Sequence, residues 1–159
     1  MKATDFTLKA LSGPDIDLAA YAGRPILVAN TASLCGFTPQ YAGLQELWTE
    51  YGPRGLAVLA VPSADFGNQE YSDPTETAAV CDARFHLTFP VAAATHVIGA
   101  GATPLFRWIG ERAGFIGRPH WNFYKYVIGR DGQLVQWFSC ITTPGARPIR
   151  SAIERALTG

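Results

Sequence analysis

Residues 25–40 read P-I-L-V-A-N-T-A-S-L-C-G-F-T-P-Q. The apolar run at 26–29 predicts a buried strand, and Thr38-Pro39 is typical of a helix start. Cys35 therefore lies in a turn between a strand end and a helix start. Backbone N–H groups and the positive end of a helix dipole favour thiolate over thiol at such a position. The segment predicts cysteine chemistry rather than simple binding.

The composition predicts one globular domain spanning residues 1–159. Hydrophobic residues make up 48% of the chain and charged residues 16%, which indicates a packed core rather than disorder. Lys plus Arg equals Asp plus Glu at 13 each, so nothing favours nucleic acid or an anionic membrane as a partner. The apolar runs are too short to span a bilayer and no hydrophobic signal region is present, so we expect a cytoplasmic protein.

Periodicity and turn signals predict the remaining elements. They are edge strands at 4–11 and 15–18, a helix at about 39–51, a strand at 56–61, a helix from 73 to about 86, a helix at 105–112, a hairpin of strands at 126–129 and 134–138, and a terminal helix at 149–157. The first core strand, its helix and the strand at 56–61 form a βαβ unit, whose strands should be parallel. The whole order predicts an α/β, thioredoxin-like fold with a mixed central sheet and helices on both faces.

The chain has three cysteines, an odd number that argues against a framework of structural disulfides. A dithiol C-x-x-C motif starting at Cys35 would place its second cysteine at position 38, which is Thr38. This favours a single attacking thiolate over a disulfide reductase. The three histidines lack metal-ligand spacing, so no metal or other cofactor is expected.

Several motifs occur in an order that resembles the glutathione peroxidase family in its cysteine form. The segment N-T-A-S-L-C-G-F-T-P-Q-Y-A-G-L-Q-E-L resembles the family's active-site segment. The resemblance continues through G-L-A-V-L-A-V-P-S-A-D-F-G-N-Q-E, F-H-L-T-F-P-V and W-N-F-Y-K-Y-V-I-G-R-D-G, and so covers essentially the whole chain.

The resemblance implies a catalytic set of four residues. Cys35 matches the peroxidatic residue, Gln69 matches its Gln partner, and Trp121 and Asn122 match the Trp and Asn. Amide and indole N–H groups are neutral donors that can stabilise a thiolate and the leaving oxygen of a peroxide. Adjacent strand residues point to opposite faces, so Trp121 and Asn122 can share the site only at an irregular strand entry.

Cys81 allows two interpretations. Its spacing from Ala78 and Phe85 places it on one helix face with apolar residues, as expected for a buried structural cysteine. The resemblance implies instead a resolving cysteine at this position. Both interpretations hold if Cys81 is buried when reduced and reaches Cys35 after its helix unwinds. Cys140 is expected to serve in packing.

The chain departs from the family pattern in two places. Asp65 stands where the family commonly has Gln, and a carboxylate near Cys35 would oppose thiolate formation. The long insertion used for assembly by tetrameric animal members is absent, which resembles the monomeric branch.

The sequence thus predicts a thiol peroxidase that reduces H2O2 and organic hydroperoxides. The Cys35 thiolate would become a sulfenic acid, form a disulfide with Cys81, and be restored by thioredoxin, with glutathione as the other possible reductant. Two alternatives stay open because the same residues would serve them: a peroxide sensor or redox relay, and a general thiol–disulfide oxidoreductase.

Overall fold

A mixed four-stranded sheet forms the centre of the computed structural model, which describes residues 1–159. In spatial order its strands are β4 (Ala57–Pro62), β3 (Ile26–Thr31), β5 (Lys125–Ile128) and β6 (Leu134–Phe138). β3 and β4 are parallel, whereas β3–β5 and β5–β6 are antiparallel. The predicted βαβ unit and the predicted hairpin are therefore both confirmed.

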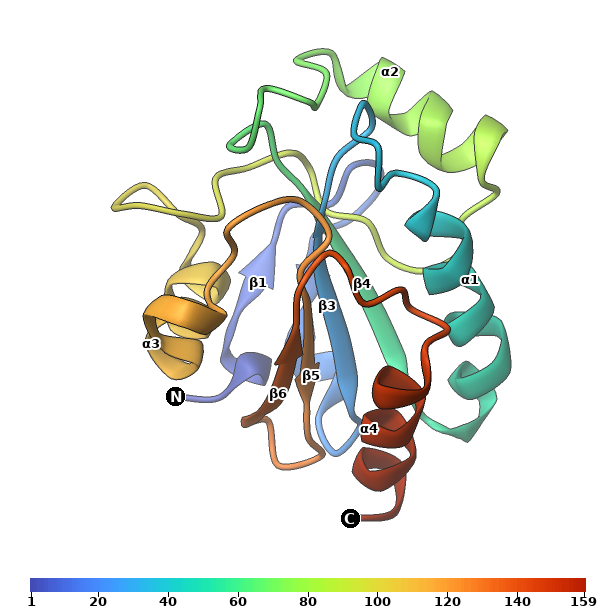
Figure 1. Cartoon of the computed structure of the whole chain (residues 1–159), viewed down its shortest axis with the longest axis vertical. Coiled ribbons are helices and arrows are strands. Elements are labelled where there is room, and N and C mark those ends of the chain that lie inside the picture. Colours follow the sequence, from blue (N-terminus) through green and yellow to red (C-terminus); the bar gives the residue numbers. More distant parts are fainter.

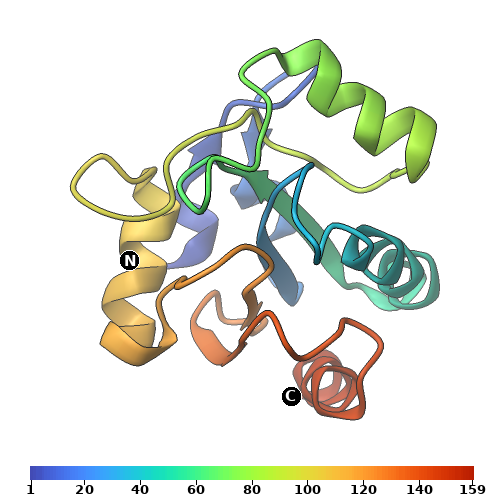
Figure 2. The ribbon, with the colours of Figure 1, turned by 45° about the horizontal axis from the view of Figure 1, so that its top comes forward.

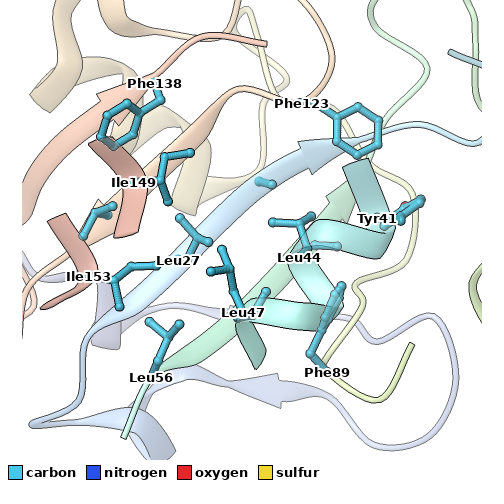
Figure 3. Packing of buried hydrophobic residues seen from close by; sticks show 14 of the residues in the cluster. Leu27, Tyr41, Leu44, Leu47, Leu56, Phe89, Phe123, Phe138, Ile149 and Ile153 are labelled. Carbon is cyan, nitrogen blue, oxygen red and sulfur yellow. The ribbon is translucent and has the colours of Figure 1, made fainter. Parts of the chain in front are cut away.

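Helices cover both faces of this sheet, as Figure 1 shows. α1 (Gln40–Tyr51) and α4 (Arg147–Thr158) lie on one face, and α3 (Pro104–Gly117) lies on the other. Figure 3 shows side chains of α1 and α4 packed over Leu27 of β3. All six residues of β3 are buried because both faces of the strand are covered. No helix combines the length and apolar character needed to cross a membrane.

The N-terminal edge strands are shorter than predicted. The ranges 4–11 and 15–18 reduce to β1 (Thr7–Leu8) and β2 (Ile16–Asp17), flanked by 3-10 turns at Ala3–Asp5 and Leu18–Tyr21. The side chain of Asp17 accepts a hydrogen bond from the Ala19 backbone N–H at 3.0 Å. This bond caps the second 3-10 turn, and so the strand ends at Asp17.

The helix predicted from 73 to about 86 is interrupted. α2 spans Pro74–Ala79 and is capped by the Asp73 side chain, and a π-helical turn follows at Val80–Arg84. In that turn the Phe85 N–H donates to the Val80 carbonyl at 3.2 Å, five residues back. Cys81 therefore lies in a wide, irregular turn rather than in a regular α-helix.

The remaining connections complete the fold. α3 extends beyond its predicted end at residue 112 and is kinked at Gly114, where φ is +77°. A short 3-10 turn, Gly52–Arg54, joins α1 to β4.

Because β3 and β4 are parallel and β6 runs in the same direction as β3, their carboxyl ends meet at one edge of the sheet. The candidate site lies at this edge.

Candidate active site

Cys35 lies in the loop between β3 and α1, as predicted from the sequence. Its side chain packs against the core and is 8% exposed, so it is more buried than its polar flanks suggested. The Phe37 backbone N–H donates to Cys35 Sγ at 3.3 Å. A hydrogen bond from an amide to sulfur stabilises the thiolate, which is the nucleophilic form.

Thr38 fixes the conformation of this loop. Its hydroxyl accepts a hydrogen bond from the Cys35 backbone N–H at 3.0 Å and donates to the Ala32 carbonyl at 2.8 Å. The position where a dithiol motif would carry its second cysteine thus holds a structural hydroxyl. The sequence predicted a helix start at Thr38 and showed that no second cysteine stands there, but it did not predict this bridging role, although a loop Thr is often a local hydrogen-bonding residue.

Gln69 and Asn122 are in direct contact although 53 positions separate them in the sequence. Asn122 Nδ2 donates to Gln69 Oε1 at 3.1 Å, and Asn122 is completely buried. The Leu34 N–H donates to the Gln69 carbonyl at 2.8 Å, which ties the Gln69 loop to the residue preceding Cys35. Because Gln69 Oε1 accepts from Asn122, Gln69 Nε2 remains available as a donor.

Trp121 and Asn122 precede β5 rather than forming part of it. Phe123, the next residue, has φ of +64°, so the chain enters the strand irregularly, as the sequence reasoning required. Asn30 at the end of β3 holds this turn: its Nδ2 donates to the Trp121 carbonyl at 2.8 Å, and its own carbonyl accepts from the Phe123 N–H at 2.6 Å. The sequence analysis did not single out Asn30. A polar residue at the end of an apolar strand could have indicated such a hydrogen-bonding role.

The Trp121 ring is positioned by the loop that carries Gln69. The rings of Trp121 and Phe66 are tilted with centroids 6.0 Å apart. At Gly67, where φ is +67°, a Cβ atom would lie 3.0 Å from the indole ring. Glycine is needed there both for the backbone conformation and for the close approach of the indole.

Asp65 does not present an unpaired carboxylate to Cys35. Its oxygens accept from the backbone N–H groups of Val97 and Ile98 at 2.7 and 3.2 Å, and one lies 2.6 Å from His96 Nδ1. Partial burial opposes ionisation of Asp65, but the hydrogen bonds from His96 and the two amides leave its pKa below the usual value. The carboxylate therefore secures the loop before α3. Asp65 was expected to oppose thiolate formation at Cys35 as a nearby carboxylate, but its oxygens are engaged by this loop.

Cys81 is buried in the same hydrophobic cluster as Cys35, and both thiols are free. Its exposed fraction is 2%, which agrees with the expectation of a buried helix position. Burial raises the pKa of the Cys81 thiol to about 11, although the neighbouring Tyr41 hydroxyl partly opposes this rise. Cys81 is therefore a protonated thiol in the folded, reduced protein at neutral pH.

A buried lysine, Lys125, and the third cysteine, Cys140, are both linked to Gln40, the first residue of α1. Lys125 is fully buried and its Nζ donates to Gln40 Oε1 at 2.8 Å, while Gln40 Nε2 donates to the Cys140 carbonyl at 2.7 Å. Desolvation lowers the pKa of Lys125 to about 7. Cys140 is only partly buried and belongs to neither hydrophobic cluster, so the predicted packing role is wrong. The reason is its position in the turn beyond the end of β6.

The structure does not gather three or more His, Cys, Asp or Glu side chains in a way that could hold a metal ion.

Comparison with known proteins identifies the family to which this arrangement belongs. The glutathione peroxidase family model matches residues 3–110. This chain belongs to the glutathione peroxidase family. A hydroperoxy fatty acid reductase of Synechocystis is 38% identical over 96% of this chain and 94% of its own length. A glutathione peroxidase-like peroxiredoxin of Schizosaccharomyces pombe is 37% identical over 88% of this chain and 90% of its own length.

Solved structures agree with this membership. The crystal structure of T. cruzi GPX1 has a TM-score of 0.80 and 27% identity, and it matches 100% of this chain and 98% of that one. The crystal structure of Trgpx in its apo form has a TM-score of 0.79 and 32% identity, over 100% and 97% of the two chains. The predicted thioredoxin-like fold is confirmed, and the chain is a thiol peroxidase.

Proposed function

We propose that Cys35 is the peroxidatic residue of this enzyme and that Gln69, Trp121 and Asn122 assist it. The observation that carries the proposal is the hydrogen-bonded contact between Asn122 and Gln69, whose loop is tied to the residue before Cys35. Three separate segments of the chain thus supply a thiol and neutral donors to one edge of the sheet. H2O2 and organic hydroperoxides are the proposed substrates.

In the proposed first step, the Cys35 thiolate attacks the terminal oxygen of the hydroperoxide. The S–O bond forms as the O–O bond breaks, and the leaving oxygen takes up a proton to depart as water or an alcohol. The amide N–H groups of Gln69 and the indole N–H of Trp121 can stabilise the charge that develops on that oxygen. Cys35 is left as a sulfenic acid.

In the proposed second step, Cys81 condenses with this sulfenic acid. The Cys81 thiol loses its proton, an S–S bond forms, and the hydroxyl of the sulfenic acid leaves as water. The irregular π-helical turn around Cys81 supports a local opening that would expose this buried thiol. Two thiols of thioredoxin would then reduce the disulfide by exchange, and glutathione is the alternative reductant.

Three further properties are proposed. Residues 1–159 form one domain, because both hydrophobic clusters pack against a single sheet. The protein is a monomer, since the insertion used for assembly in tetrameric relatives is absent from the sequence. It works in the cytoplasm, where a reducing environment keeps its three free cysteines available.

Stopped-flow turnover with thioredoxin tests the mechanism. The Cys35→Ser variant should consume no peroxide, and peroxide consumption by this variant would refute the assignment of Cys35. The Cys81→Ser variant should complete one oxidation of Cys35 but lose turnover coupled to thioredoxin, and full turnover would refute the resolving role. Peptide mapping after one equivalent of peroxide should show a Cys35–Cys81 disulfide in the wild-type protein.

A further inference from the structure

A cleft of about 700 Å³ lies on the α3 side of the molecule. It is bounded by α3, by the loop that precedes this helix, and by the segment that follows it. Figure 2 shows the yellow loop and the orange segment on the same side of the sheet as α3. Clefts that hold small organic ligands commonly have volumes of about 300–1,000 Å³, so this one is large enough for such a ligand.

The cleft adjoins the proposed catalytic residues. Phe66 lines the cleft, and its ring lies 6.0 Å from the ring of Trp121. The Phe66 carbonyl lies 3.5 Å from Asn122 Nδ2, and His120, another lining residue, directly precedes Trp121. A molecule held in the cleft would therefore lie next to Trp121 and Asn122, two of the proposed catalytic residues.

The lining of the cleft is apolar with a cationic rim. Val97, Ala102 and Phe106 are buried lining residues that supply hydrocarbon surface. Arg107 and Arg118 are exposed lining residues, and Glu111 is the one carboxylate among the residues that line the cleft. Two guanidinium groups against one carboxylate leave this rim with a net positive charge, which suits a ligand with an apolar body and one anionic end.

Asp65 holds one wall of the cleft in place. Its carboxylate holds the backbone N–H groups of Val97 and Ile98, both of which line the cleft. The substitution that separates this chain from the family pattern thus supports one wall of the cleft. The wall is fixed by hydrogen bonds before any ligand binds, which reduces the entropy lost on binding.

We propose that this cleft binds the non-reacting part of a long-chain hydroperoxide that carries a free carboxylate. The hydrocarbon chain lies against the apolar wall, the carboxylate is held by Arg107 and Arg118, and the hydroperoxide group reaches the residues beside Trp121. This inference rests on the proposed function, because it assigns a binding site for one class of substrate to the same reacting thiol.

Gly110 offers a way to fill the cleft without strain. It lies in α3 and lines the cleft, and a Cβ atom there would meet only Arg118 Cβ, at the ordinary contact distance of 4.0 Å. A Gly110→Phe side chain should therefore occupy the cleft. Gly110→Ala is the matched control, because it makes the same change in backbone freedom but adds only one methyl group.

The assay compares kcat/KM for linoleic acid hydroperoxide with kcat/KM for H2O2, using thioredoxin as reductant. In Gly110→Phe this ratio should fall about tenfold or more, since losing contact with only two methylene groups has that effect. In Gly110→Ala the ratio should stay close to that of the wild-type protein. An unchanged ratio in Gly110→Phe would overturn the proposal.

The methyl ester of the same hydroperoxide tests the cationic rim. The ester should have a KM about three- to fivefold above that of the acid, and Arg107→Gln should remove this difference. Arg112→Gln is the control, because Arg112 lies on the same helix but contacts the Met1 carbonyl outside the cleft. Equal KM values for acid and ester in the wild-type protein would overturn the assignment of a carboxylate to this rim.

The two proposals fail in different ways. Loss of H2O2 turnover in Cys35→Ser together with an unchanged substrate ratio in Gly110→Phe would refute the cleft and leave the peroxidase mechanism intact. Peroxide consumption by Cys35→Ser would refute the mechanism on which the cleft proposal rests.

Discussion

In the folded, reduced protein, Cys81 should react with iodoacetamide about a hundredfold more slowly than an exposed thiol at the same pH. Burial raises the pKa of its thiol from 9.0 to about 11. At pH 8 the thiolate fraction therefore falls from roughly one in ten to roughly one in a thousand, and only the thiolate is alkylated. The 2% exposure of the side chain hinders access of the reagent as well.

The measurement uses the Cys35→Ser variant, so that the reactive thiol does not interfere. Alkylation at pH 8 is followed by mass spectrometry of the peptide that contains Cys81, and the same protein unfolded in urea gives the rate for an exposed thiol. Equal rates in the folded and unfolded protein would refute the argument that burial holds Cys81 protonated.

A pair of variants in α2 tests whether reaction at Cys81 requires local opening. The buried Thr77 hydroxyl donates to Glu70 Oε2 at 2.9 Å and so fastens α2 to the loop after β4. Thr77→Val should raise the alkylation rate of Cys81 about tenfold, the effect of losing one hydrogen bond to a charged group. Thr75→Val, at an exposed position of the same helix, should not change it. If both variants match the parent protein, the Thr77 contact does not control the opening.

Other consequences follow from the core and the candidate site. The pKa of Lys125 is about 7 in the folded protein against an ordinary value of 10.5, so between these pH values the unfolded chain binds more protons than the folded one. The free energy of unfolding should therefore rise from pH 7 to pH 9, by at most about 1.4 kcal/mol per pH unit. Urea titrations measure this rise, and Lys125→Met should abolish it. Asn122→Ala should slow the oxidation of Cys35 by peroxide about a hundredfold in stopped-flow measurements, and an unchanged rate would exclude a role in that step. Leu44→Ala should lower the free energy of unfolding by about 2–5 kcal/mol, because Leu44 is completely buried in the core; a smaller loss in urea titrations would mean that the core closes around the deletion.

Local patterns in the sequence were sufficient to predict the main elements. The apolar runs predicted β3 and β4, and periodicity predicted the helix at about 39–51, which is α1. These predictions succeeded because a covered strand and an amphipathic helix each show a periodicity that follows from their own geometry. The π-helical turn at Val80–Arg84 was missed, since one extra residue in a helical turn barely changes that periodicity.

Apart from Cys35, the candidate residues could be named from the sequence only through the family motifs. Nothing local indicates that Gln69 meets Asn122, because 53 positions separate the two residues. Their contact depends on the pairing of β3 with both β4 and β5, which brings the two flanking loops to one edge of the sheet. Asn30, which holds the Trp121 turn, takes its role from the same pairing.

The sequence by itself determined that a cysteine stands in a turn between a buried strand and a helix, since burial pattern and helix-start signals are properties of neighbouring residues. Only the tertiary structure decided how the loops near that edge of the sheet are arranged: the Gln69–Asn122 contact, the hydrogen bond from the Val97 N–H to Asp65, and the cleft beside α3. Each of these depends on contacts between segments far apart in the chain, and such contacts are set by how the helices and loops pack around the sheet.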